Sequence, residues 1–132
     1  MRVAWSAIST EGRFILTERE TSPDTVCEHF SLLRAQGRGY FEIRGIDNEF
    51  PVLAIGFRDR HAIVHRMTSP EEMSLLAGDG TVVPGESIEV PIMDDLAEFT
   101  GEFVINVDHA WETVRRFMMT GSTADLGTWS GL

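Results

Sequence analysis

The chain has 132 residues, of which 42% are hydrophobic and 24% are charged, and this balance is ordinary for one folded domain. No apolar run is long enough to cross a bilayer, and the single cysteine excludes an internal disulfide framework. The N-terminus lacks the continuous apolar segment of a secretory signal, so we expect a cytoplasmic protein that does not associate with membranes.

The N-terminal third predicts a hairpin followed by a helix. Apolar residues alternate in Val3–Ile8 and again in Arg13–Glu18, and the polar turn between them favours a β-hairpin. Ser22 then precedes a proline and an aspartate, an order typical of a helix start with a capping hydroxyl. We expect a helix over Pro23–Gln36 that ends at Gly37 in the left-handed region.

The middle of the chain contains five short stretches with strand character, separated by turn residues. They are Gly39–Arg44, Pro51–Arg58, His61–Met67, Glu72–Ala77 and Glu86–Ile92. The tight turn at Asp59 and Arg60 indicates that at least the first three form an antiparallel meander. A Gly-rich loop separates the last two stretches, and we expect the next connection, Met93–Gly101, to be a projecting loop.

A second helix is expected over Val107–Thr120, with Asn106 as its N-cap and Gly121 at its end. Its apolar residues recur at helical spacing and form one stripe: Val107, Ala110, Trp111, Val114, Phe117 and Met118. Trp111, Phe117 and Trp129 are expected to be buried. The segment from Ser122 to the C-terminus either folds back on the core or completes a sheet edge.

This order of elements predicts a single α+β domain in which two helices pack on an antiparallel or mixed sheet of about five to seven strands. Residues 1–132 show no internal repeat or linker, so no second domain is expected. The sequence leaves the oligomeric state open between a monomer and a weak dimer.

Signatures of catalysis, metal binding and cofactor binding are absent. His61 and His65 would lie about 13 Å apart on one strand, too far to share a metal ion, and His29 and His109 have no second ligand at helical spacing. No nucleophile elbow occurs, and the glycines at 78 and 80 lack the rest of a phosphate-binding loop. We expect neither a metal, nor a cofactor, nor enzymatic activity.

The charge is distributed very unevenly along the chain. Nine arginines balance nine acids in residues 1–66, whereas residues 67–132 contain twelve acids and only two arginines, which accounts for the whole net charge of −10. Such a field repels nucleic acids and anionic membranes and speeds encounter with a basic protein surface. The alternative interpretation is a solvated face that serves only solubility.

The stretch from residue 67 to residue 114 contains eleven acids and no basic residue apart from histidine, so its exposed carboxylates lack local basic partners. We expect a partner-binding surface there. Its main candidates are Asp94, Asp95, Glu98 and Glu102, which crowd the expected loop, and the further candidates are Asp79, Glu71 and Glu72.

Several features in chain order resemble one known family. They are the strand Val52–Phe57 followed by Asp59, Arg60 and a strand containing His65; Ile88–Ile92 with Phe99, Gly101 and Phe103; and a helix that contains Ala110 and ends Phe117-x-x-Thr120-Gly121, with Trp129 shortly after. The pattern is similar to that of immunity family one (Imm-one) of bacterial polymorphic toxin systems. The family commonly has Arg-Pro after the Thr-Gly, where this chain has Ser122-Thr123.

The resemblance implies an immunity protein that binds and blocks a cognate toxin domain stoichiometrically, the toxins of this family including nucleic-acid deaminases and nucleases. The resembling residues are scaffold residues, so they imply a role and not a binding site. Two other functions stay open: a non-catalytic adaptor or self-associating module, and a small enzyme with an unrecognised site.

Overall fold

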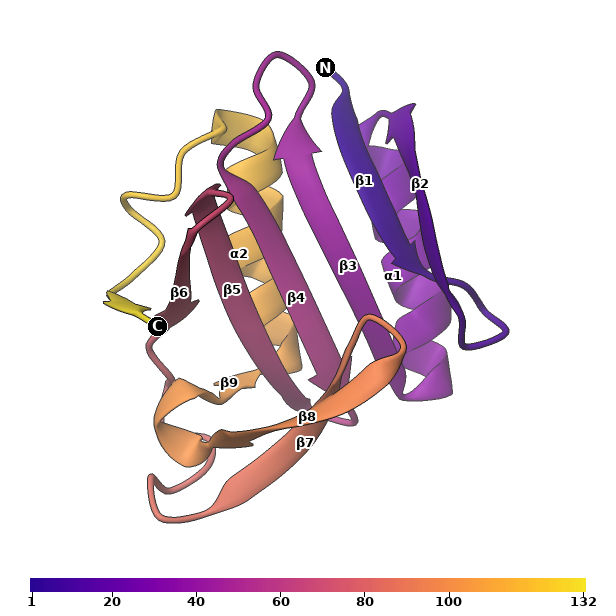
Figure 1. Ribbon diagram of the computed structural model, residues 1–132. Coiled ribbons are helices and arrows are strands. Elements are labelled where there is room, and N and C mark those ends of the chain that lie inside the picture. Colours follow the sequence, from indigo (N-terminus) through magenta and orange to yellow (C-terminus); the bar gives the residue numbers. More distant parts are fainter.

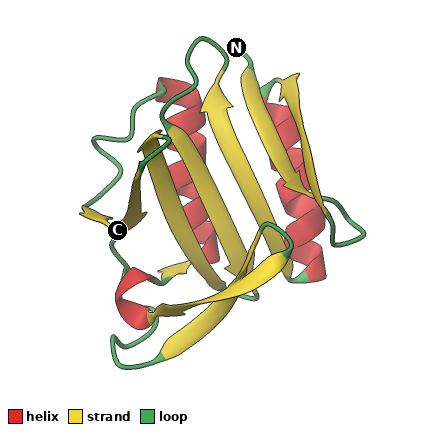
Figure 2. Cartoon of the chain, viewed as in Figure 1, coloured by secondary structure: helices red, strands yellow, loops and turns green.

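A computed structural model describes all 132 residues, which form ten strands, two α-helices and one 3-10 helix (Figures 1 and 2). In chain order these are β1 (Val3–Ile8), β2 (Phe14–Thr21), α1 (Pro23–Gln36), β3 (Arg38–Gly45), β4 (Val52–Arg58), β5 (His61–Ser69), β6 (Glu72–Leu76), β7 (Ser87–Ile92), β8 (Asp95–Thr100), η1 (Gly101–Phe103), β9 (Ile105–Asn106), α2 (Val107–Thr120) and β10 (Trp129–Gly131).

One antiparallel sheet dominates the molecule, with the strand order β10-β6-β5-β4-β3-β1-β2 and with β9 paired to one end of β5. Strands β7 and β8 form a separate two-stranded hairpin. Figure 1 shows both helices behind the large sheet and the hairpin in front of it. The predicted α+β class and the single domain with two packed helices are therefore observed.

The predicted strand count of five to seven is too low, since the large sheet alone has eight strands. The expected loop at Met93–Gly101 is also wrong, because residues 95–100 form β8 and pair with β7 along its whole length. In the segment Asp-Leu-Ala-Glu-Phe-Thr, acids and small residues interrupt the apolar alternation, and only the partner strand stabilises it as a strand.

Both helices have the predicted bounds. Gly37 and Gly121 have φ angles of 87° and 72°, and their N–H groups donate to carbonyls of the last helical turn. The Asn106 side chain accepts a hydrogen bond from the N–H of Asp108, as a cap should, but the Ser22 hydroxyl makes no capping bond. Neither helix has the length and apolar character that crossing a membrane requires.

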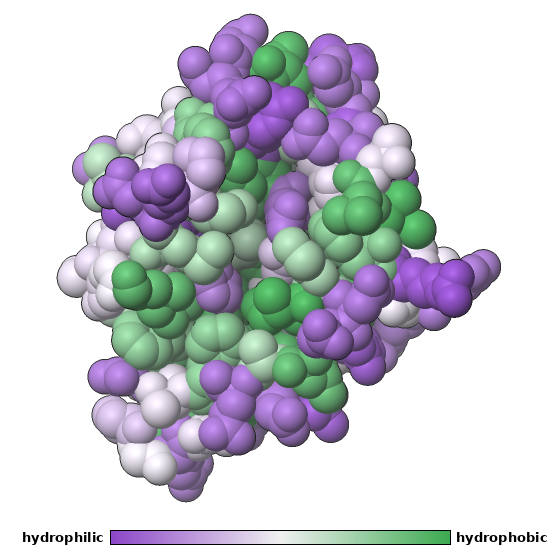
Figure 3. Space-filling model, viewed as in Figure 1, coloured by the Kyte–Doolittle hydropathy of each residue, from purple (hydrophilic) through white to green (hydrophobic).

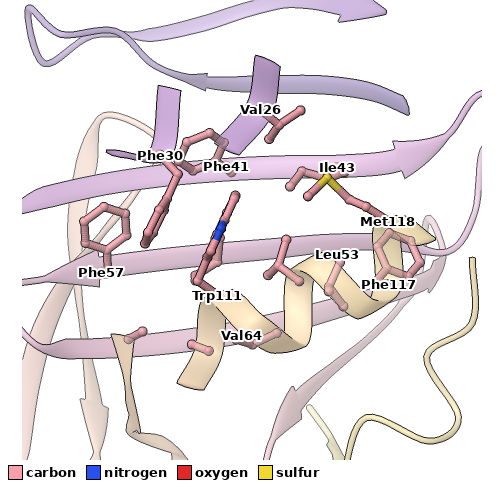
Figure 4. Close-up of a cluster of buried hydrophobic side chains, with 14 of the residues drawn as sticks. Val26, Phe30, Phe41, Ile43, Leu53, Phe57, Val64, Trp111, Phe117 and Met118 are labelled. Atoms are coloured by element: carbon pink, nitrogen blue, oxygen red, sulfur yellow. The ribbon is translucent and has the colours of Figure 1, made fainter. Parts of the chain in front are cut away.

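The core lies between the sheet and the helices, where 21 buried residues form one cluster (Figure 4). Phe30 of α1 stacks on Trp111 of α2, with ring centroids 4.0 Å apart and planes inclined by 7°. This contact joins the two helices above Phe41 and Phe57 of the sheet. Trp111 and Phe117 are buried, as predicted.

The C-terminal segment realises both expected alternatives. β10 pairs with β6 and completes the sheet edge, while the half-buried Trp129 packs against the core cluster. The Trp129 indole N–H donates to the carbonyl of Thr123 at 2.9 Å, and the guanidinium carbon of Arg66 lies 4.5 Å from its ring centroid. These contacts hold the last residues against the back of the sheet.

Candidate functional site

The β7–β8 hairpin packs its apolar side onto the front of the sheet. Val90 is fully buried with Ile63 and Leu75 of the sheet, and partly buried hydrophobic residues of the hairpin, Ile88, Ile92 and Phe99, surround them. Gly56 of β4 permits this close approach, since a Cβ atom at residue 56 would lie 2.3 Å from the carbonyl oxygen of Pro91. The hairpin is therefore a fixed part of the structure.

The hairpin crosses only one end of the front of the sheet and leaves the rest uncovered (Figure 1). Successive cross-strand partners carry their side chains on one face, and one such row is Glu20, Ala4, Arg44, Val52, Met67 and Met73. We call the uncovered part of this surface the open face. Figure 3 shows apolar residues gathered across its middle around a hollow, with hydrophilic residues at the rim.

A small pocket of about 110 Å³ opens where the hairpin turn meets the open face, and we call it the turn pocket. It is lined by Tyr40, Glu42, Ala54, His65, Met67, Met73, Ile92 and Met93. The Tyr40 hydroxyl donates to Glu42 Oε2 at 2.7 Å. Burial, together with the adjacent Glu42 carboxylate, raises the pKa of Tyr40 well above its usual range.

His65 supplies one wall of the turn pocket. Its side chain is buried, its ring meets the ring of Phe99 edge-on, and it has no hydrogen-bond partner within the protein. Burial lowers the pKa of His65 to about 4, so the imidazole is neutral at physiological pH. Glu42 is thus the one charged side chain that lines the pocket at this pH.

Four of the candidate acids lie on the hairpin or directly after it. Asp94 is in the turn, where its Oδ1 accepts a hydrogen bond of 2.8 Å from the N–H of Phe14. Asp95 and Glu98 are exposed on β8, and their side chains have no hydrogen-bond or ion-pair partner. Glu102 is in η1 and accepts a hydrogen bond of 3.1 Å from the Thr100 hydroxyl.

The carboxylate of Asp79 serves the fold. It accepts hydrogen bonds from the N–H and hydroxyl of Thr81, the N–H of Asn106 and Nδ1 of His109. Partial burial alone would raise the pKa of Asp79, but these hydrogen bonds outweigh burial and lower it to about 2. Because the bonds tie the β6–β7 connection to the start of α2, we remove Asp79 from the candidate surface.

Glu71 and Glu72 lie in a third place, at the β5–β6 turn, and in Figure 1 this turn is at the end of the sheet away from the hairpin. Glu72 accepts a hydrogen bond from the Ser69 hydroxyl, and Glu71 is exposed. The structure therefore separates the seven candidate acids into three groups, of which the hairpin group is the largest.

The hairpin also carries an acid that the sequence analysis did not single out. Glu89 of β7 lies directly opposite Glu98 of β8 in the antiparallel register, and both residues are exposed. We call the exposed carboxylates of Glu89, Asp95 and Glu98 the acidic ribbon. In the sequence, Glu89 stands between the apolar residues Ile88 and Val90, which indicates only that it faces away from them. Its position opposite Glu98 could be predicted only if β8 had been recognised as the partner strand of β7.

None of the acidic-ribbon residues takes part in an ion pair. The four ion pairs of the structure join Arg34 to Asp108, Arg44 to Glu18, His109 to Asp79 and Arg115 to Glu112. Like charges directly opposite each other destabilise a strand pair, and no cation is close enough to form an ion pair with Glu89 or Glu98. Arg58 and His61 line a shallow surface pocket together with Glu89 and are the basic side chains that share this surface with it.

No group of three or more His, Cys, Asp or Glu side chains is placed to hold a metal ion. Comparison of the chain with protein-family models and with curated proteins found no match. Its function is therefore argued from its own residues, which form an α+β domain that presents an acidic ribbon beside an open, partly apolar sheet face.

Proposed function

We propose that this protein is a cytoplasmic immunity protein that binds a cognate polymorphic-toxin domain and blocks it through the acidic ribbon. The supporting observation is the exposed pair of Glu89 and Glu98, which lie opposite each other and form no ion pair. A toxin that acts on nucleic acids needs a basic cleft for phosphates, and carboxylates at the spacing of a β-ribbon can occupy such a cleft.

The energetics favour a partner over a purely solubilising role. Opposed like charges cost a strand pair up to about 1 kcal/mol, and neither Glu89 nor Glu98 makes an ion pair that would offset this cost. Solubility alone would be served by acids spread over the surface and interspersed with bases. A basic partner turns the same repulsion into attraction and speeds association, which matters for a protein that must capture a toxin quickly.

The two turn-pocket residues with shifted pKa values, Tyr40 and His65, do not suit acid-base catalysis near neutral pH. A general acid or base works best with a pKa near the working pH, but burial moves Tyr40 and His65 away from neutrality in opposite directions. His65 also has no carboxylate or hydroxyl partner that would orient its ring. The pocket therefore supports a binding role better than a catalytic one.

The test is protection of cells from the toxin. The chain is co-expressed with the C-terminal domain of the protein encoded by the adjoining gene; that domain alone should stop growth, and the wild-type chain should restore growth and co-purify with it. The variant Glu89→Gln/Asp95→Asn/Glu98→Gln should protect less. The matched control Glu11→Gln/Glu28→Gln/Asp125→Asn changes the net charge equally at exposed acids away from the hairpin, and it should protect like wild type.

Two results would count against the proposal. Equal protection by both triple variants would exclude the acidic ribbon as the contact surface. A wild-type chain that gives no protection but forms dimers in analytical ultracentrifugation would favour the self-associating module. The exposed apolar residues Leu16, Met73, Met93 and Leu96 would then be the first surface to examine.

A further inference from the structure

We propose that the turn pocket receives an arginine side chain of the bound toxin, whose guanidinium pairs with Glu42. This inference rests on the proposed function and specifies the contact that anchors the complex. Several elements distant in the sequence build the pocket: β3 supplies Tyr40 and Glu42, β4 supplies Ala54, β5 supplies His65 and Met67, β6 supplies Met73, and the β7–β8 hairpin supplies Ile92 and Met93.

The negative charge of Glu42 in the pocket favours a positively charged ligand. The Tyr40 hydroxyl donates to one oxygen of Glu42, and the protein supplies no donor to the other oxygen. No basic side chain lines the pocket apart from the buried, neutral His65. The nearest arginine on the same face of β3 is Arg44, and Glu18 already holds it through two bonds of 2.8 and 2.9 Å.

The walls of the pocket suit the stem of an arginine. Three of the eight lining residues are methionines, whose flexible and polarisable side chains adapt to the shape of an inserted group. The methylene stem of an arginine can pack against them while its planar head reaches Glu42, with the Tyr40 ring beside it.

Other anchor side chains fit less well. An apolar side chain would bury the charged Glu42 carboxylate with the Tyr40 hydroxyl as its one hydrogen-bond donor and with no cation, which is costly in a site of low dielectric constant. A lysine would bring a compact and strongly hydrated charge, whereas a guanidinium is more weakly hydrated and can donate two parallel bonds to a carboxylate. The combination of apolar walls and one carboxylate therefore favours arginine.

The conformation of Met93 is a second observation at the mouth of the pocket. Met93 has a φ angle of 56°, in the left-handed region where turns of this kind favour glycine. It is also 44% exposed, so burial does not explain why a large apolar side chain stands there. A methionine that covers an incoming side chain would account for both facts.

The test uses the free chain with n-butylguanidinium as the probe and n-butanol as its uncharged counterpart. In NMR titrations the guanidinium compound should saturate in the millimolar range and shift the methyl signals of Met67, Met73 and Met93 and the ring signals of His65. Butanol should give much smaller shifts at the same concentrations. Equal binding of the two probes would overturn the inference.

Two variants of equal charge sharpen this test. Glu42→Gln should weaken the binding of n-butylguanidinium by about tenfold, because it removes a charge-assisted hydrogen bond. Glu20→Gln removes a carboxylate of the same face outside the pocket and should leave the affinity unchanged. Far-UV circular dichroism and the melting temperature check that both variants fold.

The complex separates this inference from the proposed function. Under the inference, Glu42→Gln should speed dissociation of the toxin, again by about tenfold, with little change in the association rate. If Glu42→Gln binds the toxin like wild type while the acidic-ribbon variant loses binding, the arginine anchor is wrong and the proposed function stands. If the toxin is not bound at all, the proposed function fails on its own experiment.

Discussion

His65 and Asp79 show how strongly position alters ordinary side chains. The imidazole of His65 is covered by the hairpin and loses its affinity for a proton, whereas the carboxylate of Asp79 gains hydrogen-bond donors and holds its charge more firmly. Both shifts link folding to pH, in two different pH ranges. Each can therefore be measured separately.

Lowering the pH should cost the protein stability through His65. The pKa of His65 is about 4 in the folded state and about 6.5 in the unfolded state, so the unfolded chain binds the proton more tightly. The free energy of unfolding therefore has its full value, as far as His65 is concerned, above pH 6.5 and falls as the pH approaches 4, by ~3 kcal/mol in all. Urea denaturation at several pH values should show this loss in wild type and not in His65→Leu. If wild type and His65→Leu lose stability equally as the pH falls, His65 is not the cause of the loss.

Asp79 should stabilise the fold in a more acidic range. Its pKa is about 2 when folded, below the value of 3.8 of a free carboxyl group. The stabilisation is complete above pH 4 and disappears as the pH falls toward 2. In urea denaturation Asp79→Asn should be less stable than wild type at pH 7, and the difference should shrink toward pH 2. Glu71→Gln, at an exposed acid, is the control and should change stability little.

At the scale of elements, the β7–β8 hairpin determines which part of the front of the sheet is exposed. It buries one end of the front of the sheet beneath Val90 and Ile92 and leaves the other end open. It also brings the Glu89–Glu98 pair and Met93 to the surface. The acidic ribbon and the turn pocket both depend on how closely the hairpin sits on β4.

Gly56→Ala should displace this hairpin. The added methyl group would lie 2.3 Å from the Pro91 carbonyl oxygen, a backbone atom that can move only with its strand. We expect a loss of about 2 kcal/mol in the free energy of unfolding and faster hydrogen exchange of the β7 amides. Gly45→Ala on β3 meets no atom within 4 Å and should not be destabilised in this way. Equal stability of the two variants would show that the hairpin is mobile.

At the scale of the whole molecule, the distribution of charge in space differs from its distribution along the chain. The seven candidate acids of the second half lie at three separate locations, and Glu18, Glu20 and Glu42 from the neutral first half lie on the open face. Arg44 of that half also lies on this face, where it pairs with Glu18. The electrostatic field of the carboxylates at the open face and hairpin therefore draws on both halves of the chain.

This field should govern the rate of toxin capture. The acidic-ribbon variant Glu89→Gln/Asp95→Asn/Glu98→Gln should associate with the toxin more slowly than wild type in low salt and show a flatter salt dependence, because screening then has less attraction to remove. Stopped-flow mixing over a range of salt concentrations measures both effects. The control Glu11→Gln/Glu28→Gln/Asp125→Asn should keep the wild-type slope. If the two triple variants behave alike, only net charge matters and the local ribbon does not.

Both helices, the first hairpin and the β3–β5 meander were predictable from the sequence, because their signals are local. Caps such as Gly37 and Asn106 and a stripe such as that of α2 act within a few residues. β8 was not predictable, because its own alternation is weak and its pairing with β7 supplies the missing stabilisation.

The candidate site depended even more on tertiary structure. The acidic stretch was visible in the sequence, but the structural role of Asp79 comes from contacts with Asn106 and His109, 27 and 30 residues away. The turn pocket joins residues of β3, β4, β5, β6 and the β7–β8 turn, none of which signals a site alone. Charge and periodicity can be read from the sequence alone. The burial of a side chain, and its position opposite a residue on another strand, exist only after distant segments pack together. The acidic ribbon and the turn pocket depend on this packing.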